Sequence, residues 1–264
     1  MSEVIVVASG KGGVGKTTTA ANIGAGLARM DKKVVLIDTD IGLRNLDVVM
    51  GLENRIIYNL VDVVEGNCRI RQALIKDRQY PGLFLLPAAQ TRNKSDVSPE
   101  QMIKLVEGLK ETFEYIILDC PAGIEQGFRN AIAAADRAVV VTTPEVSSIR
   151  DADRTIGILE SVGIRKIDLI INRIRIEMVR RGEMMSVEDV LDILSVNLLG
   201  AIPDEDSVVI AANHGEPVAG NDTLAGQAYM NIARRIAGET VPLLDLNSAR
   251  SLFQKMTSFF RKKY

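Results

Sequence analysis

The chain has 264 residues, 47% hydrophobic and 25% charged, with a net charge of −2 at pH 7. This length can bury a sizeable core, and the balanced charge argues against binding nucleic acid through bulk charge. Two distant cysteines, Cys68 and Cys120, do not favour a disulfide scaffold and cannot supply a cysteine-based metal cluster. No apolar run approaches the ~18–20 residues of a membrane span, and the first strand begins too early for a signal peptide.

Short runs rich in Val and Ile alternate with segments of helical period along the chain, which indicates a parallel sheet with crossover helices. The runs are apolar on both faces, as buried parallel strands are. Strands are predicted at residues 3–8, 32–38, 83–88, 115–120, 138–143, 167–172 and 198–203. Helices are predicted at roughly 16–30, 99–112, 125–135, 148–161, 186–195 and 224–236.

The turn between the first strand and the first helix, "GKGGVGKT", matches the phosphate-loop pattern G-x-x-x-x-G-K-[ST]. Its glycines let backbone N–H groups point inward, and the helix N-terminus adds partial positive charge beneath the phosphates. Lys16 is expected to reach the outer phosphates, and the Thr17 hydroxyl to coordinate Mg²⁺. The predicted nucleotide contacts are Gly10, Lys11, Gly12, Gly13, Val14, Gly15, Lys16, Thr17 and Thr18. The predicted fold class is therefore α/β: a P-loop NTPase-like three-layer sandwich with a mainly parallel, twisted sheet and helices on both faces.

Three aspartates follow predicted strands: Asp38 and Asp40 in "LIDTD", and Asp119 in "YIILDCPAG". Ligands of open α/β sheets bind at the carboxyl ends of the strands, so all three should face the crevice that holds the loop. Asp119 fits the acid that holds Mg²⁺, directly or through water, and Asp38 is a second candidate Mg²⁺ ligand. One of Asp38 and Asp40 is expected to orient the attacking water. The alternative for Asp38 is that it caps the turn that follows its strand.

The base is predicted to be adenine. Residues 93–96, "NKSD", match the guanine-reading N-K-x-D, but they precede the Asp119 motif, which reverses the order found in GTPases. "DCPAG" also has one residue too many for the D-x-x-G switch. Asn172, at the end of a predicted strand, offers an amide that can donate to and accept from a purine edge.

A second lysine, Lys11, lies inside the glycine turn, where it is badly placed for its own ligand and exposed toward a facing copy. "KGGVGKT" resembles the deviant Walker A motif of the MinD/ParA family of P-loop ATPases. In that family the equivalent lysine crosses a dimer interface to the nucleotide of the other subunit. Such a cation stabilises the charge that phosphoryl transfer spreads over the γ-phosphoryl oxygens. The resemblance thus implies a homodimer in the ATP state; the alternative is a solvated loop lysine.

Four further segments, residues 38–53, 85–92, 119–125 and 143–154, look like those of the septum-site-determining members of this family, and the resemblance covers essentially the whole chain. It implies ATP hydrolysis to ADP and phosphate that is slow and stimulated by a partner. Carried over by position, the phosphate and Mg²⁺ contacts fall on Lys16, Thr17 and Thr18, the water-positioning acid on Asp40, the Walker B acid on Asp119 and the adenine contact on Asn172.

The last 17 residues, 248–264, predict an amphipathic helix that carries five cations and no acid. Bulky apolar residues fall within about 120° of a helical wheel. This pattern is typical of a helix lying in the interface of an anionic membrane; the alternative is a helix packed on the protein's own core. The predicted membrane contacts are Leu252, Phe253, Met256, Phe259 and Phe260, flanked by Lys255 and Lys262. The predicted organisation is an ATPase domain at 1–237, a linker at 238–247 and the membrane-targeting helix at 248–264.

These features lead to one functional hypothesis. ATP draws two subunits together, and the dimer then holds the membrane with two weak tails, since the second binding event is intramolecular. We expect a cytoplasmic protein, peripheral on the inner face of the cell membrane. The resemblance implies a role in positioning the cell-division site, with a division inhibitor (MinC-like) and a topological specificity factor or scaffold (MinE- or DivIVA-like) as partners.

Three alternatives lie in the same family. A ParA-type partition ATPase should bear a basic surface for DNA, whereas this chain outside its tail is acidic. A flagellar-number ATPase usually has an extension before the first strand, and none is expected here. A metal-cluster carrier needs paired cysteines at the dimer interface. A fourth alternative, an ATP-binding scaffold without catalysis, would bind nucleotide and release no phosphate.

Overall fold

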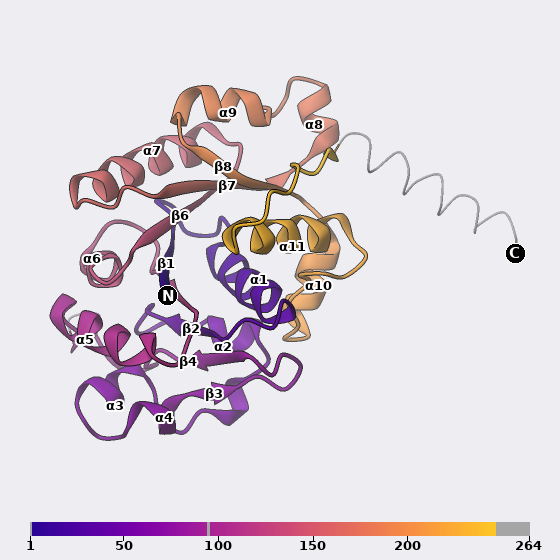
Figure 1. Ribbon diagram of the computed structural model, residues 1–264. Helices are drawn as coiled ribbons and strands as arrows, with labels where there is room; N and C mark the ends of the chain where they lie inside the picture. Colours follow the sequence, from indigo (N-terminus) through magenta and orange to yellow (C-terminus); the bar gives the residue numbers. More distant parts are fainter. Residues whose placement is uncertain (1, 94–95, 247–264) are drawn as a thin grey trace, which may run out of the picture.

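A single eight-stranded sheet forms the middle layer of the computed structural model, which describes residues 2–93 and 96–246 (Figure 1). The strand order is β3-β4-β2-β5-β1-β6-β7-β8, and all neighbours are parallel except β3 and β4. The strands are β1 (Glu3–Ala8), β2 (Val34–Asp38), β3 (Ile75–Lys76), β4 (Leu83–Leu86), β5 (Tyr115–Asp119), β6 (Arg137–Thr142), β7 (Ile167–Ile174) and β8 (Asn197–Pro203).

Helices cover both faces of the sheet, which confirms the predicted α/β three-layer class. One face packs on α1 (Lys16–Arg29), α2 (Leu46–Val49) and α11 (Leu224–Ile236), with α10 (Asp206–Asn213) beside them. The other face packs on α3 (Leu60–Val64), α4 (Ile70–Ala73), α5 (Pro99–Lys110), α6 (Gln126–Ile132), α7 (Val146–Ser161), α8 (Ile176–Arg180) and α9 (Val187–Leu194). A 3₁₀ turn lies at Glu53–Arg55.

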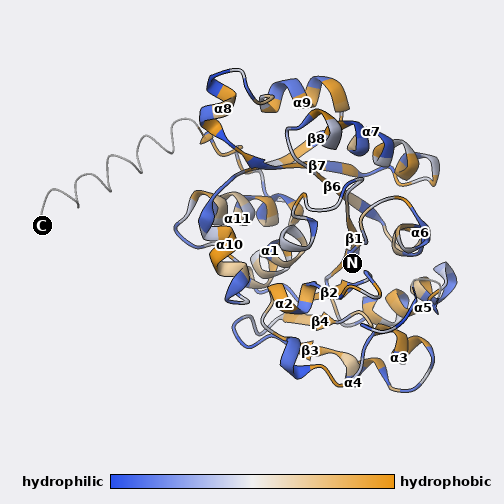
Figure 2. Cartoon of the chain, turned by 180° about the vertical axis from the view of Figure 1, so that it is seen from behind, coloured by the Kyte–Doolittle hydropathy of each residue, from blue (hydrophilic) through white to orange (hydrophobic). Residues whose placement is uncertain are grey.

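Alternate residues of each central strand enter opposite cores. In β1, Val4 and Val6 face the α5–α7 side while Ile5 and Val7 face α1, and all four are fully buried. In Figure 2 the hydrophobic colour is concentrated on the strands and on the sides of the helices turned toward them. Burial on both sides is why these strands read as continuous apolar runs rather than as an alternating pattern.

The predicted strands and the six predicted helices are all present, including the short helices α6 and α9, but several further short elements were not predicted. The unpredicted elements are β3, α2, α3, α4, α8 and α10, which have two to eight residues each. Strand β6 also begins one residue earlier than predicted, at Arg137. The guanidinium of Arg137 is buried and pairs with Asp168 of β7 at 2.6 Å, so a charged residue fits inside the strand.

The described part of the predicted linker, residues 238–246, lies against the domain. The Arg235 guanidinium donates to the carbonyls of Leu199 (2.7 Å), Val241 (2.9 Å) and Pro242. Leu246 is 8% exposed and belongs to the α5–α7 core. We call residues 239–246 the strap. The predicted membrane helix, 248–264, lies outside the described residues, and no described helix is long and apolar enough to cross a bilayer.

Candidate functional site

The glycine turn joins β1 to α1 in a conformation that requires glycine at two positions. Gly15 caps the N-terminus of α1 with φ 90°, and a Cβ there would collide with the side-chain amide of Asn172. A Cβ on Gly10 would collide with the backbone carbonyl of Asp151, because α7 packs directly against the turn. None of the described side chains caps α1, so its first N–H groups are available to an anion.

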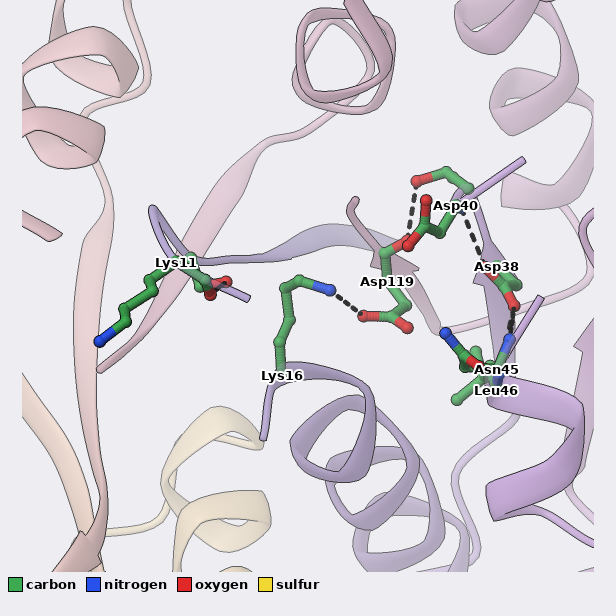
Figure 3. Close-up of polar contacts among 9 residues, drawn as sticks. Lys11, Lys16, Asp38, Asp40, Asn45, Leu46 and Asp119 are labelled. Atoms are coloured by element: carbon green, nitrogen blue, oxygen red, sulfur yellow. Dashed lines mark hydrogen bonds and ion pairs between the residues drawn. The ribbon is translucent and has the colours of Figure 1, made fainter. Parts of the chain in front are cut away.

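Lys16 and Asp119 form a buried ion pair at the carboxyl ends of the central strands (Figure 3). The Lys16 Nζ lies 3.2 Å from Oδ1 of Asp119, and the two side chains are 9% and 1% exposed. Burial is the largest influence on the pKa of Lys16 and lowers it, but the charge of Asp119, its hydrogen bond to Lys16 and the other negative charges nearby together outweigh burial, so the pKa is raised. Burial likewise raises the pKa of Asp119, and the Lys16 charge and the Thr17 hydroxyl oppose that rise. A carboxylate oxygen beside a hydroxyl is a donor set that fits Mg²⁺ bound together with phosphate.

Asp38 is also placed at this edge, directly opposite Asp119 in the β2–β5 register, and its side chain is fully buried. Its two oxygens accept hydrogen bonds from the backbone N–H groups of Asp40 (2.9 Å), Asn45 and Leu46 (3.2 Å each). Burial, together with the charge of Asp119, raises the pKa of Asp38 to about 7. The Asp38 carboxylate therefore holds the 40–45 loop and the start of α2 in place. This agrees with the alternative given for Asp38, that it caps the turn after its strand.

Asp40 follows at the rim of the same site and is half-buried. Two hydrogen bonds fix the backbone here. The N–H of Asp40 donates to Asp38 at 2.9 Å, and the hydroxyl of the preceding residue, Thr39, donates to the carbonyl of Asp119 at 2.7 Å. The charge of Asp40 raises the pKa of both Lys16 and Asp119, so its carboxylate lies within electrostatic reach of the pair. The structure thus brings Lys16, Asp119 and Asp40 together around one point.

Lys11 is turned away from this point (Figure 3). Its Nζ donates to the hydroxyl of Ser147 at 3.1 Å and lies 3.6 Å from Oε2 of Glu145, both at the N-terminus of α7. The Lys11 side chain is 42% exposed, against 9% for Lys16. The two lysines of the turn therefore occupy different environments, one inside the site and one on the surface beside it.

Asn172 joins the turn to the end of β7. Its Nδ2 donates to the carbonyl of Val14 at 2.8 Å, and its Oδ1 accepts from the N–H of Arg173 at 2.9 Å. Arg173 has φ 57°, at an irregularity in the β7–β8 pairing.

A cavity of about 150 Å³ opens beside this amide, next to Gly15 and Thr18. Its other walls come from residues that the sequence analysis did not select: Arg173, Pro203, Asp204, Glu205 and the α10 residues Val208, Val209, Ala212 and Asn213. The signal that could have found part of this wall is the acidic pair Asp204 and Glu205 directly after β8, because polar residues after a parallel strand lie at the ligand-binding edge. The position of this cavity next to the phosphate turn suits a purine base.

Comparison with known proteins agrees with this geometry. Residues 5–218 match the CobQ/CobB/MinD/ParA nucleotide binding domain family. The septum site-determining protein MinD of Synechocystis sp. is 57% identical over 95% of both chains. The MinC:MinD cell division protein complex of Aquifex aeolicus contains a chain 52% identical with a TM-score of 0.86, covering 92% of this chain and 99% of that one. The Pyrococcus horikoshii septum site-determining protein MinD complexed with Mg-ADP is 28% identical with a TM-score of 0.81, covering 89% and 96%.

A family match across residues 5–218 and more than half identity over nearly the whole chain lead to the same assignment. This chain belongs to the MinD/ParA family of nucleotide-binding ATPases and, within it, to the septum site-determining MinD proteins.

Proposed function

We propose that this chain is a membrane-associating ATPase switch that takes part in positioning the cell-division site. It binds ATP with Mg²⁺, pairs with a second copy of itself, and in that form associates with an anionic membrane and recruits a division inhibitor. The observation that carries the proposal is the separation of the two lysines. Lys16 is buried against Asp119, whereas Lys11 is held on the surface by Ser147 and Glu145.

The phosphates of ATP are proposed to lie against the turn and the uncapped N-terminus of α1. Lys16 then exchanges Asp119 for the outer phosphates, which releases the Asp119 carboxylate. Asp119 and the Thr17 hydroxyl hold Mg²⁺, which supplies positive charge to the phosphate oxygens when bound. The adenine occupies the cavity beside Asn172.

Asp38 and Asp40 are proposed to have different roles, one structural and one catalytic. Because three backbone N–H groups already engage the two oxygens of Asp38, we assign it to holding the loop rather than to metal ligation. The loop in turn sets the position of Asp40, which orients the attacking water. An acid held by a fixed backbone stays aligned as charge develops in the transition state.

Lys11 is proposed to act on the nucleotide of a second copy. From its place beside Ser147 it contributes nothing to its own Lys16–Asp119 centre. A cation delivered across an interface stabilises the charge on the transferring phosphoryl group only after pairing. Hydrolysis to ADP and phosphate is therefore slow in the monomer and coupled to the dimer.

Membrane association is assigned to residues 248–264. Fully burying one of the five apolar side chains contributes about 1.5–3 kcal/mol. Each cation near an anionic leaflet adds about 1 kcal/mol. The entropy cost of ordering a short helix opposes both contributions, so a single tail binds the membrane weakly. Two tails on one dimer bind far more tightly, because the second binding event is intramolecular. The protein would then be cytoplasmic and peripheral on the inner face of the membrane.

The MinC:MinD complex of Aquifex aeolicus supports a MinC-like division inhibitor as a partner of this chain as well. A topological specificity factor or scaffold, MinE-like or DivIVA-like, and a partner that stimulates hydrolysis complete the proposal.

Co-sedimentation with anionic vesicles tests the switch. We expect binding with ATP and little with ADP or without nucleotide; equal binding in all three would contradict the coupling. Lys11→Ala should retain nucleotide binding and lose hydrolysis. The matched control is Lys32→Ala, since Lys32 is also part-exposed and paired, with Glu114 at 3.3 Å, and should hydrolyse ATP normally.

A further inference from the structure

Two adjoining grooves lie next to the strap, on the side of the molecule that carries α8 and α9. The first has a volume of about 200 Å³ and is walled by β7, α9, β8 and the strap residues 243–246. The second has a volume of about 660 Å³ and is lined by three methionines, Met178, Met184 and Met185, together with Val146. We call the second one the methionine groove. Val179 and Ser186 line both grooves, so the two adjoin each other.

The described chain ends inside the first groove. Leu246 is 8% exposed there, and Arg235 fixes the strap through the carbonyls of Val241 and Pro242. The chain continues for 18 residues, 247–264. A chain of that length that leaves from the first groove can reach across the adjoining methionine groove, because even a helix advances about 1.5 Å per residue.

The methionine groove complements that segment in chemistry. Methionine side chains adapt to irregular apolar partners, and Val146 leaves 61% of its surface exposed at the rim. The methionine groove is lined by three acidic residues, Glu145, Glu183 and Asp189, and by two basic ones, Arg173 and Arg175. The first groove adds two acidic residues, Glu188 and Asp245, and no cation. The segment itself has five large apolar residues, five cations and no acid.

We propose that residues 248–264 dock in the methionine groove of the nucleotide-free monomer, so that the apolar face assigned to the membrane is covered by the protein itself. This inference rests on the membrane role given to the tail under the proposed function. Glu145 belongs both to the groove lining and to the contact that holds Lys11. Pairing through Lys11 therefore covers one wall of the groove and competes with the docked tail. ATP then acts twice, by joining two tails and by releasing each of them.

The experiment uses the full chain with Met178→Glu, which places a charge in the groove, and Met178→Leu as the conservative control. Binding to phosphatidylglycerol vesicles without nucleotide should rise about tenfold in Met178→Glu. The substitution releases the docked tail, so a larger fraction of the molecules has a tail that can bind the membrane. It should stay at the wild-type level in Met178→Leu. Binding with ATP should be equal in all three proteins.

A second readout needs no membrane. A solvent-sensitive fluorophore is attached to Phe253→Cys in a Cys68→Ser background, since the other cysteine, Cys120, is buried. Its emission without nucleotide should be blue-shifted, and should move to the red with ATP or with Met178→Glu. If Met178→Glu does not fold, as judged by circular dichroism, Val146→Glu, at another residue of the groove lining, replaces it.

Solvent-like emission in the nucleotide-free wild type, or unchanged nucleotide-free binding in a folded groove variant, would overturn the docking. A nucleotide-free dimer that Met178→Glu dissociates would also overturn it, because a second copy would then occupy the groove. A blue shift that Met178→Glu removes, in a protein that never binds vesicles with ATP, would uphold the docking and contradict the proposed function instead.

Discussion

Replacing Glu145 by Gln tests whether the contact between Lys11 and α7 belongs to the monomer. The Lys11 Nζ lies 3.6 Å from Glu145, and the side chains are 42% and 58% exposed. Exposed pairs of this kind contribute about 0.2–1 kcal/mol each. A dimer in which both copies of Lys11 cross to the partner loses two such pairs, about 1 kcal/mol together in the middle of that range. Glu145→Gln has no pair to lose, so its ATP-bound dimer should be tighter than wild type by about fivefold.

Sedimentation equilibrium with ATP and Mg²⁺ measures this difference, and rising salt should reduce it because screening weakens exposed pairs. The matched control is Glu239→Gln, which removes an equally exposed ion pair with Arg234, at 2.7 Å and remote from the turn. Its dimer affinity should equal that of wild type. A weaker dimer in Glu145→Gln would refute the reasoning, since Glu145 would then meet Lys11 across the interface rather than within one chain.

Three further substitutions test the site and the fold. Gly15→Ala should weaken ATP binding by about tenfold or more in calorimetry, because alanine is strained at positive φ and its Cβ collides with Asn172. Arg137→Met should lower the free energy of unfolding in urea by about 3–5 kcal/mol, since it leaves the Asp168 carboxylate buried without its guanidinium; replacing Asp168 by Leu as well should restore most of the loss. Burial raises the pKa of Tyr229 from 10.0 to about 12, so wild-type stability should fall as pH rises from 10 to 12, by about 3 kcal/mol, and Tyr229→Phe should remove that fall.

The strands were predictable because burial on both faces makes their central positions continuously apolar and confines most polar residues to the strand ends, as in β2 and β5. Where that rule fails, the prediction failed too: β6 begins at Arg137, whose charge is compensated by Asp168 from a strand distant in sequence. Four of the missed helices have only four or five residues, which is too few turns for a period to show. Helix α10 is as long as the predicted α9 and was missed for another reason: Val209 and Ile210 are both more than half exposed, so these apolar residues do not mark a buried face.

The parts of the site that follow from strand ends could be predicted from sequence, and the parts that follow from hydrogen bonding could not. The positions of Lys16 and Asp119 at one edge required only the phosphate loop and the parallel sheet. The role of Asp38 depends on three N–H groups within the next eight residues, and their direction is set by the path of the chain into α2. The cavity beside Asn172 depends partly on α10, whose own residues show no helical period, so that only the acidic pair after β8 pointed to this wall.

The burial of the two lysines in one turn decides which of them can move. Lys16 is 9% exposed and paired with a carboxylate that is 1% exposed, and separating buried charges costs several kcal/mol unless another anion replaces the partner. Lys16 therefore leaves Asp119 only when phosphate arrives at the same place. Among the described residues, the contacts of Lys11 with Ser147 and Glu145 are exposed and are lost at a cost of about 1 kcal/mol or less. The turn thus holds one cation that is fixed until an anion replaces its partner and a second that can leave its contacts at little cost, as its proposed role in a dimer requires.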